Sequence, residues 1–119
     1  MKRILGGVMF VMFLGAAPLW VQSFKGNEYE KGKTLYRKEC QLCHGLKGDG
    51  KGPAAQSLLM HPADFTDPEF WKDGVEKVIA YTIINGKEMM PAFDLKPGEI
   101  QSIVWFMSHT FNKKAQNDD

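Results

Sequence analysis

The residues with the clearest chemical potential are two cysteines and a histidine in the string Cys40-Gln41-Leu42-Cys43-His44. Cysteines three positions apart on a helical turn point the same way, so both thiols can reach one edge of a single planar group. The C-x-x-C-H spacing is the sequence form of c-type haem attachment. We therefore predict one covalently bound haem c, with Cys40 and Cys43 as attachment points and His44 as an axial ligand to its iron.

The same cysteines allow three other interpretations. A disulfide between positions 40 and 43 would close a very small loop and would constrain the unfolded chain little. A thioredoxin-like redox pair needs a βαβ surrounding, which this sequence does not predict. A zinc site could use both cysteines with His44 and His61, but the neighbours Cys43 and His44 make an awkward tetrahedral pair. A zinc or disulfide binding module without haem stays an alternative to a cytochrome.

Three stretches place small and apolar residues at helical spacing, and these elements would position the thiols and the imidazole. Asn27 is placed to cap a first helix over about 28–41, which runs to the first cysteine. A second helix is predicted over about 74–84, ended by Asn85 and Gly86. Pro97 opens a last helix. Its apolar residues are Ile100, Ile103, Val104, Met107 and Phe111.

Glycine and proline interrupt the chain between these helices. Residues 45–53 hold four glycines and a proline, which predict a loop because they cannot continue a helix. Residues 54–73 are broken by Pro62 and Pro68 and indicate a loop with a short helical turn. No pair of strands stands out. The predicted fold class is all-α, with about three main helices and long loops.

The N-terminus has the layout of an export signal. Lys2 and Arg3 precede an apolar stretch over residues 4–21, as a cationic start precedes the apolar segment of a signal peptide. We expect residues 1–23 to be a cleaved signal peptide or an N-terminal membrane anchor, since about 18 apolar residues can just span a bilayer core. Residues 24–119 would form the functional domain, outside the cytoplasm and in the periplasm.

Composition limits the classes of protein to which this chain can belong. The chain has 119 residues, of which 44% are hydrophobic and 24% charged. These values indicate one folded domain and exclude a disordered or low-complexity chain. The formal net charge of +1 gives no reason to expect a nucleic acid as a partner.

Over residues 29–111, the chain resembles the class I cytochrome c family. Four stretches in the expected order carry the resemblance: Cys40-Gln41-Leu42-Cys43-His44-Gly45, Gly52-Pro53, Asn85-Gly86-Lys87-Glu88-Met89-Met90-Pro91-Ala92-Phe93, and the closing helix over 100–107. In that family the sixth iron ligand is a methionine directly before a proline, which points to Met90, with Met89 as its rival. The backbone carbonyl of Pro53 is the implied acceptor for the second ring nitrogen of His44.

The resemblance also implies a function. It is electron transfer by a cytochrome c-like fold around one haem, whose iron cycles between Fe(II) and Fe(III) with a histidine and a methionine as axial ligands. Such a carrier is not an enzyme. Its partners would be a redox donor and a redox acceptor, among them a membrane or periplasmic oxidoreductase complex. The alternatives are a haem-containing subunit of a larger oxidoreductase and a small haem peroxidase.

Packing expectations follow from the same resemblance. Gly32 and Tyr36 of the first helix should meet the last helix. Their expected neighbours there are Ile103 and Phe106. Six apolar residues are expected either to contact the haem or to pack in the core: Leu58, Leu59, Phe65, Tyr81, Ile84 and Phe93. His61, in a loop broken by proline, is expected to be an ordinary surface histidine.

Overall fold

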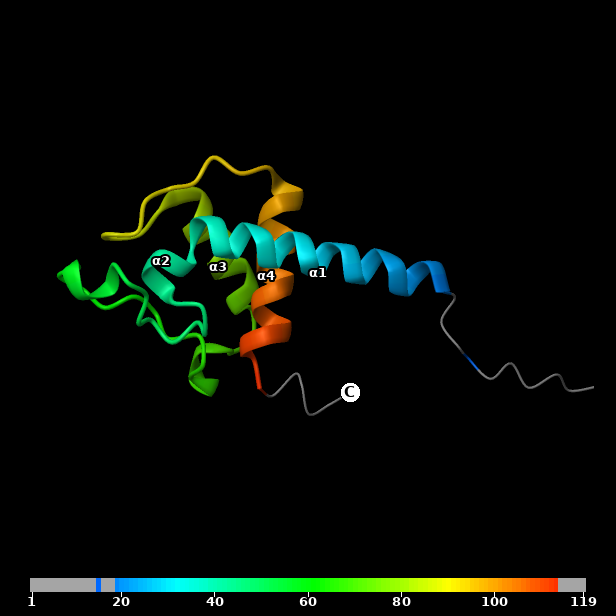
Figure 1. Cartoon of the computed structure of the whole chain (residues 1–119), viewed down its shortest axis with the longest axis horizontal. Coiled ribbons are helices and arrows are strands. Elements are labelled where there is room, and N and C mark those ends of the chain that lie inside the picture. Colours follow the sequence, from blue (N-terminus) through cyan, green and yellow to red (C-terminus); the bar gives the residue numbers. More distant parts are fainter. Residues whose placement is uncertain (1–14, 16–18, 114–119) are drawn as a thin grey trace, which may run out of the picture.

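The computed structural model describes residue 15 and residues 19–113. In these residues the chain forms helices and no strand, apart from one isolated bridge between Lys87 and Met90. The elements are α1 (Leu19–Glu39), α2 (Gln41–His44), the 3-10 helices η1 (Ala55–Ser57) and η2 (Pro68–Phe70), α3 (Val75–Asn85) and α4 (Pro97–Phe111). The predicted all-α fold with long connections is confirmed (Figure 1).

Two predicted helices agree closely with the structure. α3 ends at Asn85, and Gly86 follows with a φ of 73°, a conformation that favours glycine and stops the helix. α4 begins at Pro97, as predicted. The carboxylate of Glu99 accepts a 2.8 Å hydrogen bond from the backbone N–H of Lys96. This bond satisfies a donor that the start of a helix would otherwise leave free.

The first helix differs from its prediction at both ends. α1 begins at Leu19, well before the predicted start, so Asn27 lies inside the helix and does not cap it. Residues 19–25 contain neither glycine nor proline, and the helix continues through them. At the other end, the backbone of Cys40 departs from regular helix geometry, with φ −113° and ψ −37°. The chain then enters the single turn of α2.

Most of the predicted N-terminal segment over residues 1–23 lies outside the described residues. Residues 19–23 form the start of α1. Among the described helices, none combines the length and the hydropathy needed to cross a bilayer. The division of the chain at position 23 stays a prediction.

α1 and α4 form the main helix pair and cross each other (Figure 1). Gly32 is buried at this crossing, where an added Cβ would collide with the carbonyl of Ser102 and lie 2.8 Å from the Cβ of Phe106. Only glycine allows the two backbones to approach so closely. The hydroxyl of Ser102 is fully buried and donates to the carboxylate of Glu28. The predicted contact of Gly32 with the last helix is confirmed.

Aromatic side chains fill the space beside this crossing. The ring centroid of Tyr36 lies 5.4 Å from that of Phe106 and 5.4 Å from that of Phe111. Phe65 belongs to the connection over residues 54–73, called the long loop below, and its ring lies 6.0 Å from that of Phe111. Burial of each such side chain contributes about 1.5–3 kcal/mol of stability. This cluster therefore holds α1, α4 and the long loop together, and it confirms the predicted contact of Tyr36 with Phe106.

The glycine-rich segment over residues 45–53 is a loop, as predicted, and it folds back on α2. The backbone N–H groups of Gly52 and Ala54 donate to the carbonyls of Cys43 and Leu42, at 3.0 and 2.9 Å. An added Cβ on Gly52 would meet the backbone of α2, since it would lie 2.7 Å from the carbonyl carbon of Cys43. The glycine thus lets the loop close directly onto the turn that carries the cysteines.

Candidate functional site

One cavity contains the residues that the sequence selected for chemistry. Its volume is about 380 Å³, within the usual range for small-molecule sites. Its walls come from the end of α1 together with α2, from residues 58–65, from α3, from residues 87–93 and from Met107 of α4. Most of these side chains are apolar. Cys40, Cys43 and His44 all face it.

The single turn of α2 brings the two cysteines and the histidine to the same wall. The backbone N–H groups of Cys43 and His44 both lie close to the carbonyl of Cys40, at 3.2 and 3.0 Å. Both cysteines are free and partly buried. Burial raises the pKa of Cys40 to about 12, and the neighbouring charge of Glu39 adds to the effect. Its sulfur is therefore a neutral thiol at pH 7 rather than a thiolate.

His44 is held on two sides. Its Nδ1 lies 3.2 Å from the carbonyl of Ala63, and because a carbonyl can only accept, Nδ1–H is the donor. Its ring stacks on that of Phe65, with centroids 4.6 Å apart and planes 20° apart. Burial lowers the pKa of His44, and the hydrogen bond to Ala63 opposes this shift. The neutral ring keeps a lone pair on Nε2, which is the form that binds a metal.

The acceptor for His44 differs from the one predicted. The sequence resemblance implied the carbonyl of Pro53, whereas the structure places the carbonyl of Ala63 at this nitrogen. The reason is the docking of the long loop on the glycine-rich loop, where the N–H of Phe65 donates to the carbonyl of Gly48 at 2.7 Å. No local pattern marks Ala63, because its role depends on contact between segments distant in the sequence.

The opposite side of the cavity is formed by α3 and the loop after it. Val78 and Thr82 line the cavity beside the buried Ile79 and Ile83. Val78 is 60% exposed, since the cavity opens to solvent in front of it. The backbone N–H of Phe93 donates to the carbonyl of Ile83 at 2.9 Å, which ties the following loop to α3.

Residues 87–90 form a tight turn at the cavity. Lys87 and Met90 exchange two backbone hydrogen bonds, at 2.9 and 2.8 Å. Glu88 has a φ of 53° and is, within the described residues, the one non-glycine residue with a positive φ. This conformation is uncommon for a residue with a side chain and occurs often at functional sites. The turn places two methionines at the cavity.

All four methionines in the described part of the chain line this cavity. They are Met60, Met89, Met90 and Met107. Met90 is half-buried and packs against the hydrophobic core, whereas Met89 is 44% exposed. Both predicted candidates for the sixth ligand therefore lie at the site.

The predicted apolar contacts divide into two groups. Leu58, Phe65 and Phe93 line the cavity. The remaining three do not line it and are 94%, 67% and 54% exposed: Leu59, Tyr81 and Ile84. α3 turns Val78 and Thr82 toward the cavity, so Tyr81 and Ile84 on its other face point away. The predicted packing in the core is wrong for these three residues, and none of them lines the cavity.

Several lining residues escaped sequence analysis. Phe70 ends the short helix η2, and nothing in the sequence marks it as part of the site. Val75 begins α3 on the apolar side of that helix, but its place at the cavity was not predicted. His61 is exposed, as predicted, but it also lines the cavity. The imidazole of His61, a group able to bind a metal, was the available signal in the sequence.

The chemistry of this cavity fits a haem better than a metal ion alone. Two thiols on one side of a turn, a neutral imidazole and a thioether are the groups that hold a haem c and its iron. By contrast, the described ranges contain no group of three or more His, Cys, Asp or Glu side chains that could hold a metal ion. The zinc alternative therefore gains no support.

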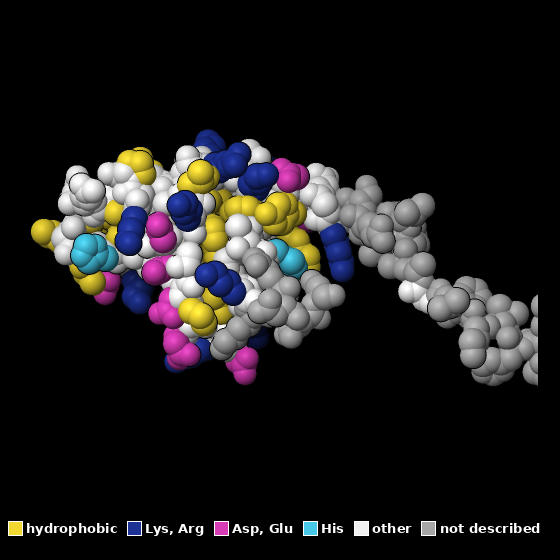
Figure 2. Space-filling model, turned by 60° about the horizontal axis from the view of Figure 1, so that its bottom comes forward, with side chains coloured by type: hydrophobic (Ala, Val, Ile, Leu, Met, Phe, Trp, Pro, Cys, Tyr) yellow, Lys and Arg dark blue, Asp and Glu magenta, His cyan; other side chains and the backbone are white. Residues whose placement is uncertain are grey.

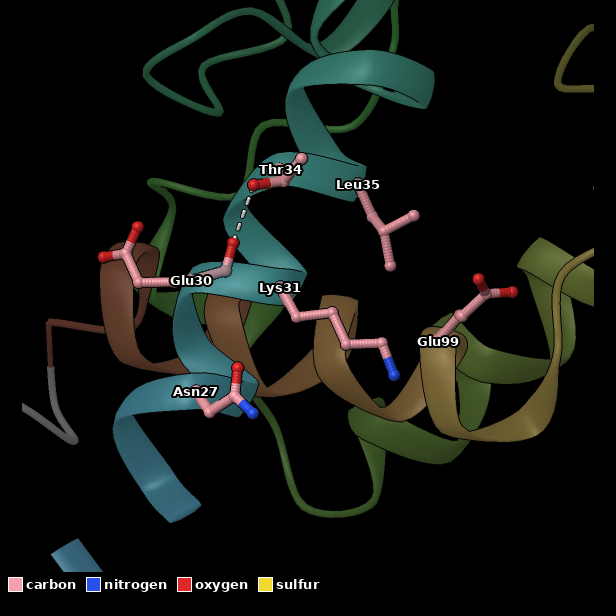
Figure 3. Close-up of a pocket in the computed structure, with 6 residues that line it drawn as sticks. All are labelled: Asn27, Glu30, Lys31, Thr34, Leu35 and Glu99. Atoms are coloured by element: carbon pink, nitrogen blue, oxygen red, sulfur yellow. Dashed lines mark hydrogen bonds between the residues drawn. The ribbon is translucent and has the colours of Figure 1, made fainter. Parts of the chain in front are cut away.

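A second, shallower depression lies between α1 and the start of α4. Figure 3 shows its lining residues, Asn27, Glu30, Lys31, Thr34, Leu35 and Glu99. It offers neither a thiol nor an imidazole. Basic and acidic side chains are interspersed over the face in Figure 2, so this view shows no surface of a single charge sign. The cavity at the cysteines is the candidate functional site.

Comparison with known proteins agrees with this chemistry. The model of the family described as cytochrome C oxidase, cbb3-type, subunit III matches residues 27–107. Comparisons with curated proteins and with solved structures gave no match. The matched range includes both cysteines, His44 and Met90, and it covers well over half of the chain. The protein therefore belongs to this family of c-type cytochromes, whose domain binds haem and transfers electrons.

Proposed function

We propose that the protein is a monohaem c-type cytochrome that carries single electrons between redox partners. The haem would be bonded to Cys40 and Cys43, with His44 and Met90 as its axial ligands. The observation that carries this proposal is that two thiols, a neutral imidazole and the Met90 thioether line one cavity. A bound haem would supply an iron that cycles between Fe(II) and Fe(III).

The chain's own residues would prepare the site for that task. Ala63 and Phe65 hold the His44 ring from two directions, so its orientation would change little between oxidation states. Met90 offers a soft thioether, which opposite a histidine favours the reduced iron. The apolar side chains of α3, with Met107 of α4, would lower the polarity around the iron, which also favours the reduced form.

We propose that this site belongs to an electron carrier rather than to an enzyme. Two axial ligands leave no open position for a substrate, which separates a carrier from a peroxidase. The thiols and the imidazole at the cavity would be occupied in holding the haem and would therefore not serve as nucleophile or base. Electrons would pass through the exposed edge of the site when a partner docks there.

The second candidate function is that of a haem subunit in a larger oxidoreductase. The description of the matching family names an oxidase subunit, and this favours a membrane oxidase as donor or acceptor complex. Residues 1–23 would then direct export to the periplasm and serve as a signal peptide or an anchor.

Visible spectroscopy tests the proposal. We expect protein purified from cells competent in cytochrome maturation to show the spectrum of one low-spin haem per chain, bound covalently, with a sulfur-to-iron charge-transfer band when oxidised. His44→Ala should lose the low-spin spectrum, and His109→Ala is the matched control. Fully folded, colourless protein would contradict the proposal. A high-spin spectrum without the charge-transfer band would instead favour a peroxidase.

A further inference from the structure

Two consecutive methionines, Met89 and Met90, line the same cavity. In extended chain, neighbouring side chains point to opposite sides. Here the tight turn of residues 87–90, with the positive φ of Glu88, brings both Met89 and Met90 to the cavity. Of the four methionines at the site, two therefore come from a single turn, where one thioether would suffice for ligation.

The two methionines are held very differently. The backbone of Met90 makes both hydrogen bonds of the turn with Lys87, and its side chain packs against the core. Pro91 restricts its backbone further. Met89 occupies the middle of the turn, outside those two bonds, and is 44% exposed. Few packing contacts would be lost if its flexible side chain moved.

We propose that Met89 is a reserve axial ligand, which binds the haem iron when Met90 is unavailable. This inference rests on the proposed haem site with Met90 as its usual ligand. Because the Met90 side chain packs against the core, it is the preferred ligand. The Met89 side chain is less packed and is free to move. A thioether in reserve would keep the same ligand chemistry, and therefore a similar reduction potential, after loss of Met90.

Three variants test the reserve ligand: Met90→Leu, Met89→Leu and the double variant with both changes. Leucine replaces methionine at small cost in stability, about 1.5 kcal/mol or less, and the covalent bonds would retain the haem. The readouts are the sulfur-to-iron charge-transfer band and the shifted methyl resonance of an iron-bound methionine in the NMR spectrum. Met60→Leu is the matched control, because Met60 lines the same cavity from a different segment.

Met89→Leu should keep the full charge-transfer band. Met90→Leu should keep a measurable part of it, with a methyl resonance at a new position. The double variant should lose the band entirely. Addition of Met60→Leu to Met90→Leu should leave the residual band unchanged, so that loss of the band in the double variant assigns the band to Met89.

Other outcomes would overturn the inference in distinguishable ways. Complete loss of the band in Met90→Leu, whether the iron becomes high-spin or takes a nitrogen ligand from His61 or Lys87, would exclude Met89 as a reserve and leave Met90 as the ligand. Loss of the band in Met89→Leu with a full band in Met90→Leu would overturn both the inference and the proposed role of Met90. A residual band that disappears with Met60→Leu would assign the reserve role elsewhere.

Discussion

The hydroxyl of Tyr36 donates a buried 2.8 Å hydrogen bond to the backbone carbonyl of Gly45. Tyr36 precedes the cysteine string and Gly45 follows it, so this bond closes the segment that carries Cys40, Cys43 and His44. The wall of the cavity is thereby fastened to α1 at both of its ends. The strength of this fastening can be measured.

Replacement of Tyr36 by phenylalanine should lower the free energy of unfolding. The change removes one of the two hydrogen bonds that the buried carbonyl of Gly45 accepts, since the backbone N–H of Gly48 still donates to it at 3.1 Å. Loss of one such bond costs about 0.5–1.5 kcal/mol. Denaturant unfolding of the haem-loaded protein measures the loss. Tyr29→Phe is the control, since its hydroxyl bonds Thr110 at a partly buried site and should cost less. Equal effects of the two changes would argue against a special role for the bond to Gly45.

Ionisation of Tyr36 should lower the stability of the protein at alkaline pH. Burial, with the nearby Cys40 and Asp49, raises the pKa of Tyr36 above its usual value of 10.0. A group whose pKa is higher in the folded state than in the unfolded state stabilises the folded protein at pH values below the unfolded-state pKa. This contribution is lost as the pH rises toward the folded-state pKa. Unfolding measured from pH 9 to about 11 should therefore show a steeper decline in the natural protein than in Tyr36→Phe. Parallel declines would contradict this assignment.

The close approach of α1 and α4 makes Gly32 sensitive to substitution. Gly32→Ala should reduce stability by about 1–3 kcal/mol, because the new methyl group would meet the backbone of Ser102. Gly26→Ala lies in the same helix with open space around it and should instead stabilise the helix by about 0.5–1 kcal/mol. Thermal unfolding of both variants gives the comparison. A neutral Gly32→Ala would mean that the helices can move apart freely.

The ring of Phe65 supports both the core and the histidine. Phe65→Ala removes the stack on His44 and the contact with Phe111, with an expected cost of about 3–5 kcal/mol. Leu59→Ala, at a position 94% exposed, should change stability by no more than about 0.5 kcal/mol. Denaturant unfolding measures both. The reduction potential of Phe65→Ala should also shift, since the His44 ring loses one of its two supports.

Loss of the haem attachment should impair folding. A small domain with long loops has a thin protein core and depends on an added group for stability. Replacement of Cys40 and Cys43 by alanine should therefore sharply lower the yield of folded protein from cells competent in cytochrome maturation. Gln41→Ala, between the two cysteines, should leave the yield unchanged. Circular dichroism and haem content measure the result, and near-normal folding without haem would contradict the expectation.

Sequence reasoning succeeded where a feature depends on neighbouring residues. Gly86 marks the end of α3 and Pro97 marks the start of α4. The glycines of residues 45–53 mark the loop. The first helix was predicted less well, because Asn27 can cap a helix but nothing in the sequence forces the helix to begin there. A preferred capping residue is a weak signal when the preceding residues also favour a helix.

The family resemblance supplied predictions of contacts between distant segments, which hold for Gly32 and Tyr36 with the last helix but not for His44. The partner of His44 was predicted as Pro53 and is Ala63, because the docking of the long loop on the glycine-rich loop sets which carbonyl reaches the ring. Leu59 is apolar in sequence and almost fully exposed in the structure, since a short irregular segment has no periodicity that marks its buried face.

The sequence alone determined which chemical groups the site uses, because the spacing of Cys40, Cys43 and His44 along the chain is independent of the rest of the fold. It did not determine the surroundings of these groups. Packing of α1 on α4 and of the long loop on α2 decided which side chains face the cavity, how the histidine is held and how differently Met89 and Met90 are buried. Such contacts arise from the shape of the whole folded chain, and short stretches of sequence carry little information about them.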